Sequence, residues 1–178
     1  MTIRKLSIRD IDDIMAIERV SFPTPWSRHA FVSELSQNPY AEYYGAVQDG
    51  RLIGYGGMWL ILDEAHVTNI AVLPQYRRRG VGEVLLKVLM EKAGLKGADW
   101  ITLEVRESNL GAQRLYQKHG FSQKGLRRGY YTSTKEDAII MSRSLRAGES
   151  GEGAGEARRV RGTGRGSGGD PVRQRVVP

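Results

Sequence analysis

The sequence of 178 residues contains no cysteine. Disulfide bonds, thiolate catalysis and zinc sites built from cysteine are therefore excluded. No stretch of about 20 apolar residues occurs, so the sequence predicts no membrane span. Residues 1–6 are not followed by the apolar run of a secretory signal. Together with the missing cysteine, this favours a cytoplasmic protein.

Histidine is also scarce. The three histidines, His29, His66 and His119, lie far apart without the spacing of metal ligands, so no metal site is predicted. Positive charge is in mild excess. The net charge is +7, with +4 in residues 1–145 and +3 in residues 146–178. A net positive charge of this size is compatible with binding of an anionic ligand, and equally with a location close to RNA, such as the ribosome.

Composition divides the chain near residue 145. The last 33 residues contain nine glycines, seven arginines and no aromatic residue. Such a segment buries too little apolar surface to offset its ordering entropy, so residues 146–178 are predicted to form a disordered tail. A weak contact with RNA and a simple solvated extension are both compatible with this Gly/Arg composition. Residues 1–145 are predicted to form one domain.

The most informative stretch follows an apolar run, Ile70-Ala71-Val72-Leu73, that is closed by Pro74. Its sequence is Arg77-Arg78-Arg79-Gly80-Val81-Gly82, and it opens a helical pattern of apolar residues. The first turn of a helix carries unpaired N–H groups, and glycine lets an anion approach them. The pattern therefore predicts a cradle for a pyrophosphate. A basic helix start with glycines for close packing is the plainer alternative.

The remaining pattern predicts an α+β order of elements. Strands are expected around residues 6–8, 43–47, 52–62, 66–72, 100–105 and 137–141, and a further strand-like run starts at Phe121. Helices are expected at about 11–20, 27–35, 81–92 and 109–119. Asp49-Gly50 indicates a tight hairpin turn, and residues 127–131 are read as a further hairpin region. Asp10, Ser27 and either Ser108 or Asn109 are the expected helix caps.

Two segments resemble the Gcn5-related N-acetyltransferase (GNAT) superfamily. They run from Asn69 to Gly82 and from Leu103 to Phe121, in the expected order and spacing. The resemblance covers residues 1–145 and implies a three-layer α/β/α fold. In that fold a mixed, mostly antiparallel sheet has a splayed parallel strand pair that admits acetyl-CoA. It also implies a set of cofactor contacts, namely Ile70, Ala71, Val72, Arg77, Arg78, Arg79, Gly80, Val81, Gly82, Asn109 and Tyr116.

Two residues are candidates for the chemistry of such an enzyme. Glu104 lies in an apolar strand pattern and would accept the proton of the amine. Tyr116 would give a proton to the departing thiolate, and Asn109 lies two helical turns before it on the same face. From spacing alone, Glu104 is also compatible with a solvent-exposed pair with Arg106, and Tyr116 with a core tyrosine. The resemblance favours the catalytic roles, with direct attack of the amine.

A narrower resemblance is to the bacterial ribosomal-protein-alanine N-acetyltransferases. It is carried by the segments 22–27, 128–131 and 136–141. It implies that Phe22, Trp26, Tyr130 and Tyr131 bind the acceptor, and that the acceptor is the N-terminal alanine of small-subunit ribosomal protein eighteen. Two alternatives stay open at this stage. One is an acetyltransferase for other N-termini, lysine side chains or small amines, and the other is a non-catalytic module that binds CoA or RNA.

Overall fold

The computed structural model describes residues 1–132 and 134–146 and the backbone of residues 175–176. The predicted disorder of the tail therefore concerns residues that mostly lie outside this part. The strands are β1 Thr2–Lys5, β2 Ala41–Gln48, β3 Arg51–Ile61, β4 Glu64–Val72, β5 Trp100–Arg106, β6 Ser122–Tyr131, β7 Glu136–Ser144 and β8 Arg175–Val176. The helices are α1 Ile11–Ser21, α2 Arg28–Ser36, α3 Val81–Leu95 and α4 Leu110–Lys118, with short 3₁₀ helices at Ile8–Asp10 and Pro74–Tyr76.

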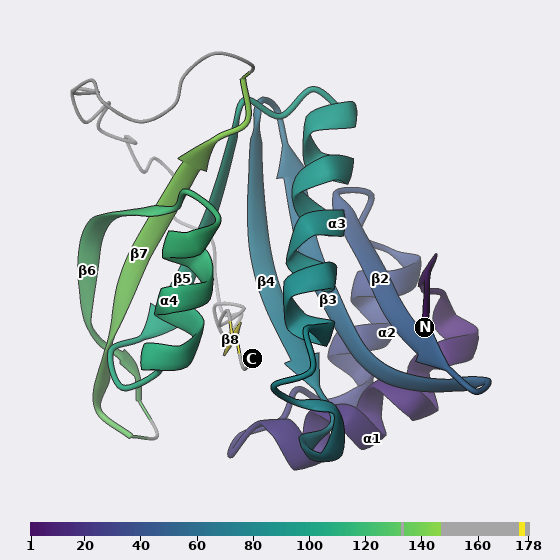
Figure 1. The fold of residues 1–178 in the computed structure, drawn as a ribbon. Helices are drawn as coiled ribbons and strands as arrows, with labels where there is room; N and C mark the ends of the chain where they lie inside the picture. The colour runs from purple at the N-terminus through teal and green to yellow at the C-terminus, as the bar shows by residue number, and fades with distance from the viewer. Residues whose placement is uncertain (133, 147–174, 177–178) are drawn as a thin grey trace.

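One mixed sheet organises the chain, with the strand order β1-β2-β3-β4-β5-β7-β6 (Figure 1). Along this path every pair is antiparallel except β4 and β5, which run parallel. Their pairing starts at Glu64 and Trp100 and stops at His66 and Thr102. Beyond this point the two strands separate. The predicted α+β fold with a splayed parallel pair is confirmed.

A β-bulge marks the place where β4 leaves β5. Gly57 pairs with Asn69 and Met58 pairs with Val67, so Thr68 is an extra residue in β4. A bulge bends its strand and re-aims the side chains that follow it. Glycine is required opposite the bulge, because a Cβ atom at Gly57 would lie 2.8 Å from Asn69 Oδ1 and closer still to a tyrosine ring. The bulge therefore helps to open the sheet at the site.

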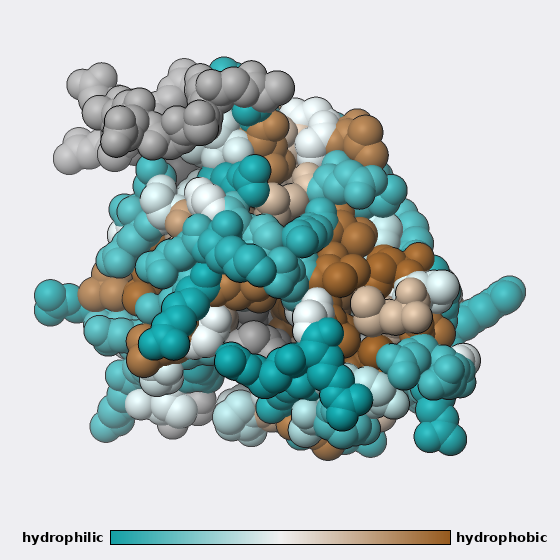
Figure 2. All heavy atoms as spheres, viewed as in Figure 1, coloured by the Kyte–Doolittle hydropathy of each residue, from teal (hydrophilic) through white to brown (hydrophobic). Residues whose placement is uncertain are grey.

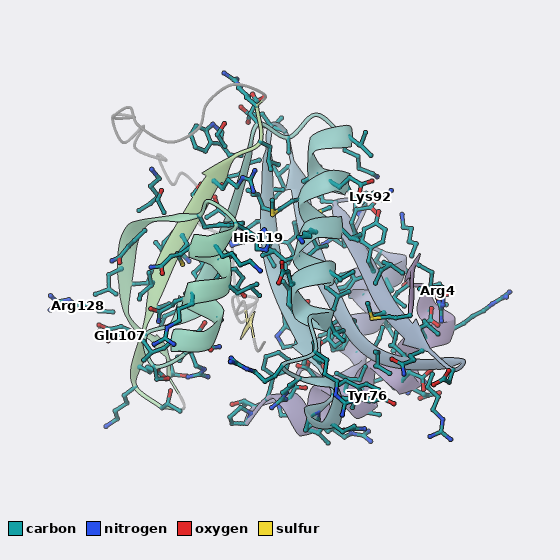
Figure 3. All side chains as sticks on the ribbon, in the orientation of Figure 1. Arg4, Tyr76, Lys92, Glu107, His119 and Arg128 are labelled. Atoms are coloured by element: carbon teal, nitrogen blue, oxygen red, sulfur yellow. The ribbon has the colours of Figure 1, made fainter. Side chains whose placement is uncertain are left out.

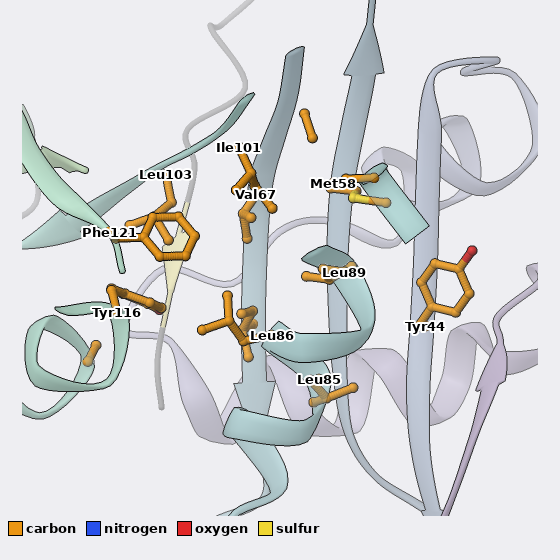
Figure 4. Close-up of a cluster of buried hydrophobic side chains, with 14 of the residues drawn as sticks. Tyr44, Met58, Val67, Leu85, Leu86, Leu89, Ile101, Leu103, Tyr116 and Phe121 are labelled. Carbon is orange, nitrogen blue, oxygen red and sulfur yellow. The ribbon is translucent and has the colours of Figure 1, made fainter. Parts of the chain in front are cut away.

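Helices cover both faces of the sheet. On one face α3 and α4 bury an apolar cluster that includes Leu85, Leu86 and Leu89 of α3 with Leu103 of β5 and Tyr116 of α4 (Figure 4). On the other face α1 and α2 cover a second cluster. It contains Ile14, Phe22, Phe31, Tyr43 and Tyr55. None of the helices in the described part has the length and apolar character needed to cross a membrane.

Most local expectations hold. Asp49 and Gly50 have φ values of 51° and 75°, as the tight hairpin turn requires. Ser27 accepts a hydrogen bond from the backbone N–H of Ala30 and caps α2. Asn109 caps α4 in the same way, through the N–H of Ala112.

Two local predictions are wrong. The first strand precedes residue 6, and Asp10 makes no side-chain cap for α1. Instead, Asp10 closes the capping box of Ser7 and pairs with Arg4. The strand-like run expected from Phe121 is β6, and the predicted hairpin region at residues 127–131 is the end of β6 in its hairpin with β7.

Candidate active site

Glu104 lies on β5 at the start of the opening between β4 and β5. Its side chain is completely buried, and both carboxylate oxygens have a cationic or polar partner. His66 Nε2 lies 2.8 Å from Oε2, and Arg127 Nη1 lies 3.1 Å from Oε1. The solvent-exposed pair with Arg106 is therefore wrong, because Arg106 pairs with Glu136 at 3.0 Å. A buried, charge-balanced carboxylate at a gap in a sheet is a candidate general base.

The two sides of the opening face different helices. Leu103 and Val105 pack in the cluster under α3 and α4. Because side chains alternate along a strand, Glu104 points to the opposite face, which carries α1 and α2. Tyr116 belongs to the α4 side. A reaction between groups from both sides must therefore take place within the opening itself.

Two buried tyrosines lie near each other at the site, and one of them, Tyr131, lies close enough to Glu104 to be affected by its charge. Burial raises the pKa of Tyr116, and the neighbouring Tyr131 adds to that rise. Burial also raises the pKa of Tyr131, with Arg106 opposing the rise and Glu104 adding to it. The Arg106 guanidinium lies 3.8 Å from the centre of the Tyr131 ring. The buried Tyr131 hydroxyl has no hydrogen-bond partner in the described part of the chain, so a polar group of a substrate could be held there.

The predicted cradle lies at the start of α3. Gly80 has a φ of 82°, in the left-handed region, and no atom lies within 4 Å of the place where its Cβ would be. Gly80 supplies no side-chain cap, so the first N–H groups of α3 keep their capacity to bind an anion. Figure 2 shows hydrophilic side chains gathered over the loop that leads into α3. These features fit the diphosphate of a coenzyme A group.

The three arginines of the cradle differ in their contacts. Arg77 donates from Nε to the carbonyl of Val72 at 2.9 Å and thereby ties the loop to the end of β4. The Arg78 guanidinium lies near the start of α4, 3.9 Å from the position of a Cβ at Gly111. Arg79 is exposed and lies 5.8 Å from the ring centre of Tyr76. Arg78 is thus the cradle arginine that reaches across the mouth of the opening towards the Asn109 cap.

The edge of β4 beyond the last pair with β5 is occupied in part by β8. This short strand pairs in parallel with β4 at Asn69 and Ile70 and also lies against β5 (Figure 1). Ile70, Ala71 and Val72 are the residues predicted to offer backbone groups to the pantetheine arm. A segment near the C-terminus and the predicted cofactor contact therefore fall on the same strand edge.

The predicted acceptor residues lie in two places. Phe22 is buried in the cluster under α1 and α2, and Trp26 is half-buried with its ring 5.3 Å from that of Phe31. The buried Glu18 carboxylate accepts a hydrogen bond from the Trp26 backbone N–H at 2.8 Å and fixes the loop between the helices. Tyr130 lies on β6, with its ring 5.2 Å from that of Tyr131. Trp26 and the tyrosine pair remain predictions for acceptor binding.

A comparison with family models matches residues 11–121 to the acetyltransferase (GNAT) family. The chain belongs to the GNAT family. Members of this family are acetyl-CoA-dependent acetyltransferases, so the chain is an enzyme of this class. The matched range contains the cradle, Glu104 and Tyr116.

Individual GNAT relatives agree with this result. The chain is 45% identical over 139 residues to the Bacillus subtilis (strain 168) protein named "Putative ribosomal protein bS18-alanine N-acetyltransferase", covering 78% of this chain and 92% of the relative. Identity to the Escherichia coli (strain K12) ribosomal protein bS18-alanine N-acetyltransferase is 37% over 143 residues, covering 79% and 95%. The crystal structure of the E. coli ribosomal-protein-S18-alanine N-acetyltransferase superposes with a TM-score of 0.76 at 35% identity, covering 88% and 97%.

Sequence reasoning missed two residues of this GNAT site. His66 was considered only as a metal ligand, and Arg127 only as part of a hairpin. Both pair with Glu104 through the register of the sheet, which no local pattern encodes. A histidine near the start of a strand, where that strand belongs to a parallel pair that splays apart, is a weak signal for a site residue. It could have pointed to His66.

Proposed function

We propose that this enzyme acetylates the N-terminal α-amine of a protein, and that its acceptor is the N-terminal alanine of ribosomal protein bS18. The observation that carries the proposal is the buried Glu104 at the opening of the parallel pair, on the face opposite the predicted cofactor cradle. The names of the E. coli and B. subtilis relatives support this choice of acceptor.

In the proposed mechanism Glu104 accepts one proton from the α-ammonium group of the acceptor. An α-amine has a pKa of about 8, so most of it is protonated at neutral pH and needs a base. The neutral amine forms the N–C bond as the C–S bond of the thioester breaks, and the second proton that the nitrogen loses ends on the departing sulfur, so the products are the amide and the CoA thiol. Bound acetyl-CoA supplies the activated acetyl group. No covalent acyl-enzyme is required, which agrees with the lack of cysteine.

Tyr116 is proposed to stabilise the departing sulfur. Its pKa is raised by burial, so the hydroxyl keeps its proton at neutral pH and can donate. Full proton transfer to a thiolate with a pKa of about 8.5 is uphill from such a group. We therefore assign Tyr116 mainly a strong hydrogen bond to the developing negative charge. The main-chain groups of Ile70 to Val72, the α3 N-terminus and Arg78 are proposed to hold the rest of the cofactor.

Mass spectrometry of acetyl transfer tests the proposal. The acceptor is a peptide that begins Ala-Arg-Tyr, the start that the resemblance implies for the ribosomal target. The matched control is the same peptide with a blocked N-terminus and an internal lysine. One acetyl group on the α-amine of the first peptide alone is expected. Acetylation of the control peptide would instead assign the enzyme to lysine side chains.

A further inference from the structure

The partners of Glu104 differ in how easily they can leave. His66 lies on β4 at the last residue pair with β5, and its side chain is 21% exposed. Arg127 lies on β6, reaches across β7 to Glu104, and its side chain is 51% exposed. An arginine that is half in water exchanges protein contacts for solvent at low cost. Arg127 is therefore the exchangeable partner, and His66 is the fixed one.

Space for the arginine to cross β7 comes from the register. Arg127 pairs with Ala138, and Ala138 also pairs with Arg106 on β5. The small Ala138 side chain leaves room for a diagonal path over β7 towards Glu104. The Arg127 guanidinium also lies 5.6 Å from the centre of the Tyr130 ring. That aromatic face offers the cation an alternative contact when it leaves the carboxylate.

The partners of Glu104 lie where an amine would approach it. Arg127 contacts Oε1 and His66 contacts Oε2, so an amine that approaches either oxygen competes with the partner already there. The α-ammonium group of a protein carries one positive charge and N–H donors, as a guanidinium does. Exchange of one for the other keeps the buried charge balanced, whereas addition of a second cation beside Arg127 would not.

We propose that Arg127 occupies the position at Glu104 where the acceptor's α-ammonium group binds. The acceptor displaces Arg127 from Glu104, while His66 keeps the carboxylate oriented. This inference rests on the proposed function. In the exchanged state one ammonium N–H donates to Oε1, and that proton passes to Glu104 when the amine becomes neutral. The acetylated product is uncharged. After Glu104 has lost its proton to solvent, Arg127 returns and favours product release.

The groups that face this exchange come from every strand around it. His66 lies on β4, Glu104 and Arg106 on β5, Arg127 and Tyr131 on β6, and Glu136 on β7. Arg106 is held by Glu136 and by the Tyr131 ring, so it is already occupied. Arg127, by contrast, pairs with Glu104 and is half exposed.

Steady-state kinetics of Arg127→Gln test the proposal, with the Ala-Arg-Tyr peptide as acceptor. Arg128→Gln is the matched control. Arg128 is the next residue, and its side chain extends outward from β6, away from the rest of the sheet (Figure 3). Loss of Arg127 removes a competitor for Glu104. The KM for the peptide should therefore fall by about fivefold, the change in affinity expected when an exposed ion pair is lost. The KM for acetyl-CoA and the kcat should change less than about twofold. Arg127→Lys should return the KM for the peptide towards the wild-type value.

A second probe isolates the charge of the acceptor. A des-amino peptide, which lacks the α-amine, cannot compete with Arg127 for Glu104. Its inhibition constant should be the same for the wild type and for Arg127→Gln. A higher KM for the normal peptide in Arg127→Gln would overturn the proposal and make Arg127 a binding contact. A lower kcat at unchanged KM would also overturn it. A wild type that acetylates no α-amine would instead overturn the proposed function itself.

Discussion

Replacement of Glu104 by Gln removes the proposed base and keeps its shape. At neutral pH we expect kcat to fall about 100-fold, at the lower end of the range for general base catalysis. The rate of the variant should then follow the small fraction of amine that is already neutral. It should therefore rise about tenfold per pH unit until the pH reaches the amine pKa of about 8. The wild type should show a flatter profile, so the 100-fold gap between the two rates should narrow by about tenfold once the pH exceeds the amine pKa.

The same structure predicts a small loss of stability for this variant. Removal of one member of a fully buried ion pair costs about 3–5 kcal/mol, because the other charge stays buried without a partner. Here the remaining cation, Arg127, is 51% exposed and can move into water. The amide of the variant still accepts a hydrogen bond from His66. We expect the free energy of unfolding to fall by no more than about 1 kcal/mol.

Acetyl-transfer rates between pH 6 and 9.5, together with urea denaturation, check both statements. Glu107→Gln is the matched control, because Glu107 is an exposed glutamate three residues further along the chain (Figure 3). It should leave the rate and the pH profile unchanged. A Glu104→Gln variant with wild-type kcat at pH 7 would refute the role of the base. A loss of several kcal/mol, with a weaker binding of acetyl-CoA, would show that Glu104 is mainly structural.

Four further predictions follow from single features of the structure. Tyr116→Phe should lower kcat by about tenfold, as expected for a lost hydrogen bond to a charged group, with little change in melting temperature. Gly80→Ala, at a φ of 82°, should raise the KM for acetyl-CoA and cost about 1 kcal/mol of stability in thermal unfolding. Asp10→Asn should cost about 0.5–1 kcal/mol in urea denaturation, because it removes the ion pair with the half-exposed Arg4 and keeps an oxygen for the Ser7 capping box. The hydrogen bond with Arg4 lowers the pKa of Asp10, so this contribution is present above pH ~4 and is lost as the pH falls through the lowered value. Removal of residues 147–178 takes β8 from the edge of β4 and should lower the KM for acetyl-CoA; an unchanged KM would show that the strand does not compete.

The sequence predicted those parts of the fold that depend on local chemistry. The Asp49-Gly50 turn, the Ser27 and Asn109 caps and the helix after Gly80 depend on residues close together in the chain, and all four are present. The splayed strand pair came from the resemblance of two longer segments. In contrast, β6 is an exposed edge strand whose polar residues carry little periodic signal, so the sequence predicted its start at Phe121 and a hairpin region at residues 127–131 but not its pairing.

The site shows the same division between local and long-range information. Glu104 was predicted as a base from the family resemblance, whereas its spacing alone favoured an exposed pair with Arg106, and its burial fits the predicted role. Its two partners could not be predicted, because each depends on the pairing of distant strands. His66 reaches it across the last pair of β4 and β5, which are separated in sequence by α3. Arg127 reaches it over β7, and the small Ala138 side chain makes this path available.

The division of the site between two faces of one sheet explains why the parallel pair is so short. The cradle at α3 and the tyrosine of α4 lie on one face, whereas Glu104 and the helices α1 and α2 lie on the other. Had β4 and β5 stayed paired beyond His66 and Thr102, backbone hydrogen bonds would separate the two sides. The bulge at Thr68 and the end of pairing at His66 open the sheet at the level of Glu104. In the proposed reaction an amine from one face reaches a thioester from the other through this opening, and Glu104, the proposed base, lies beside it.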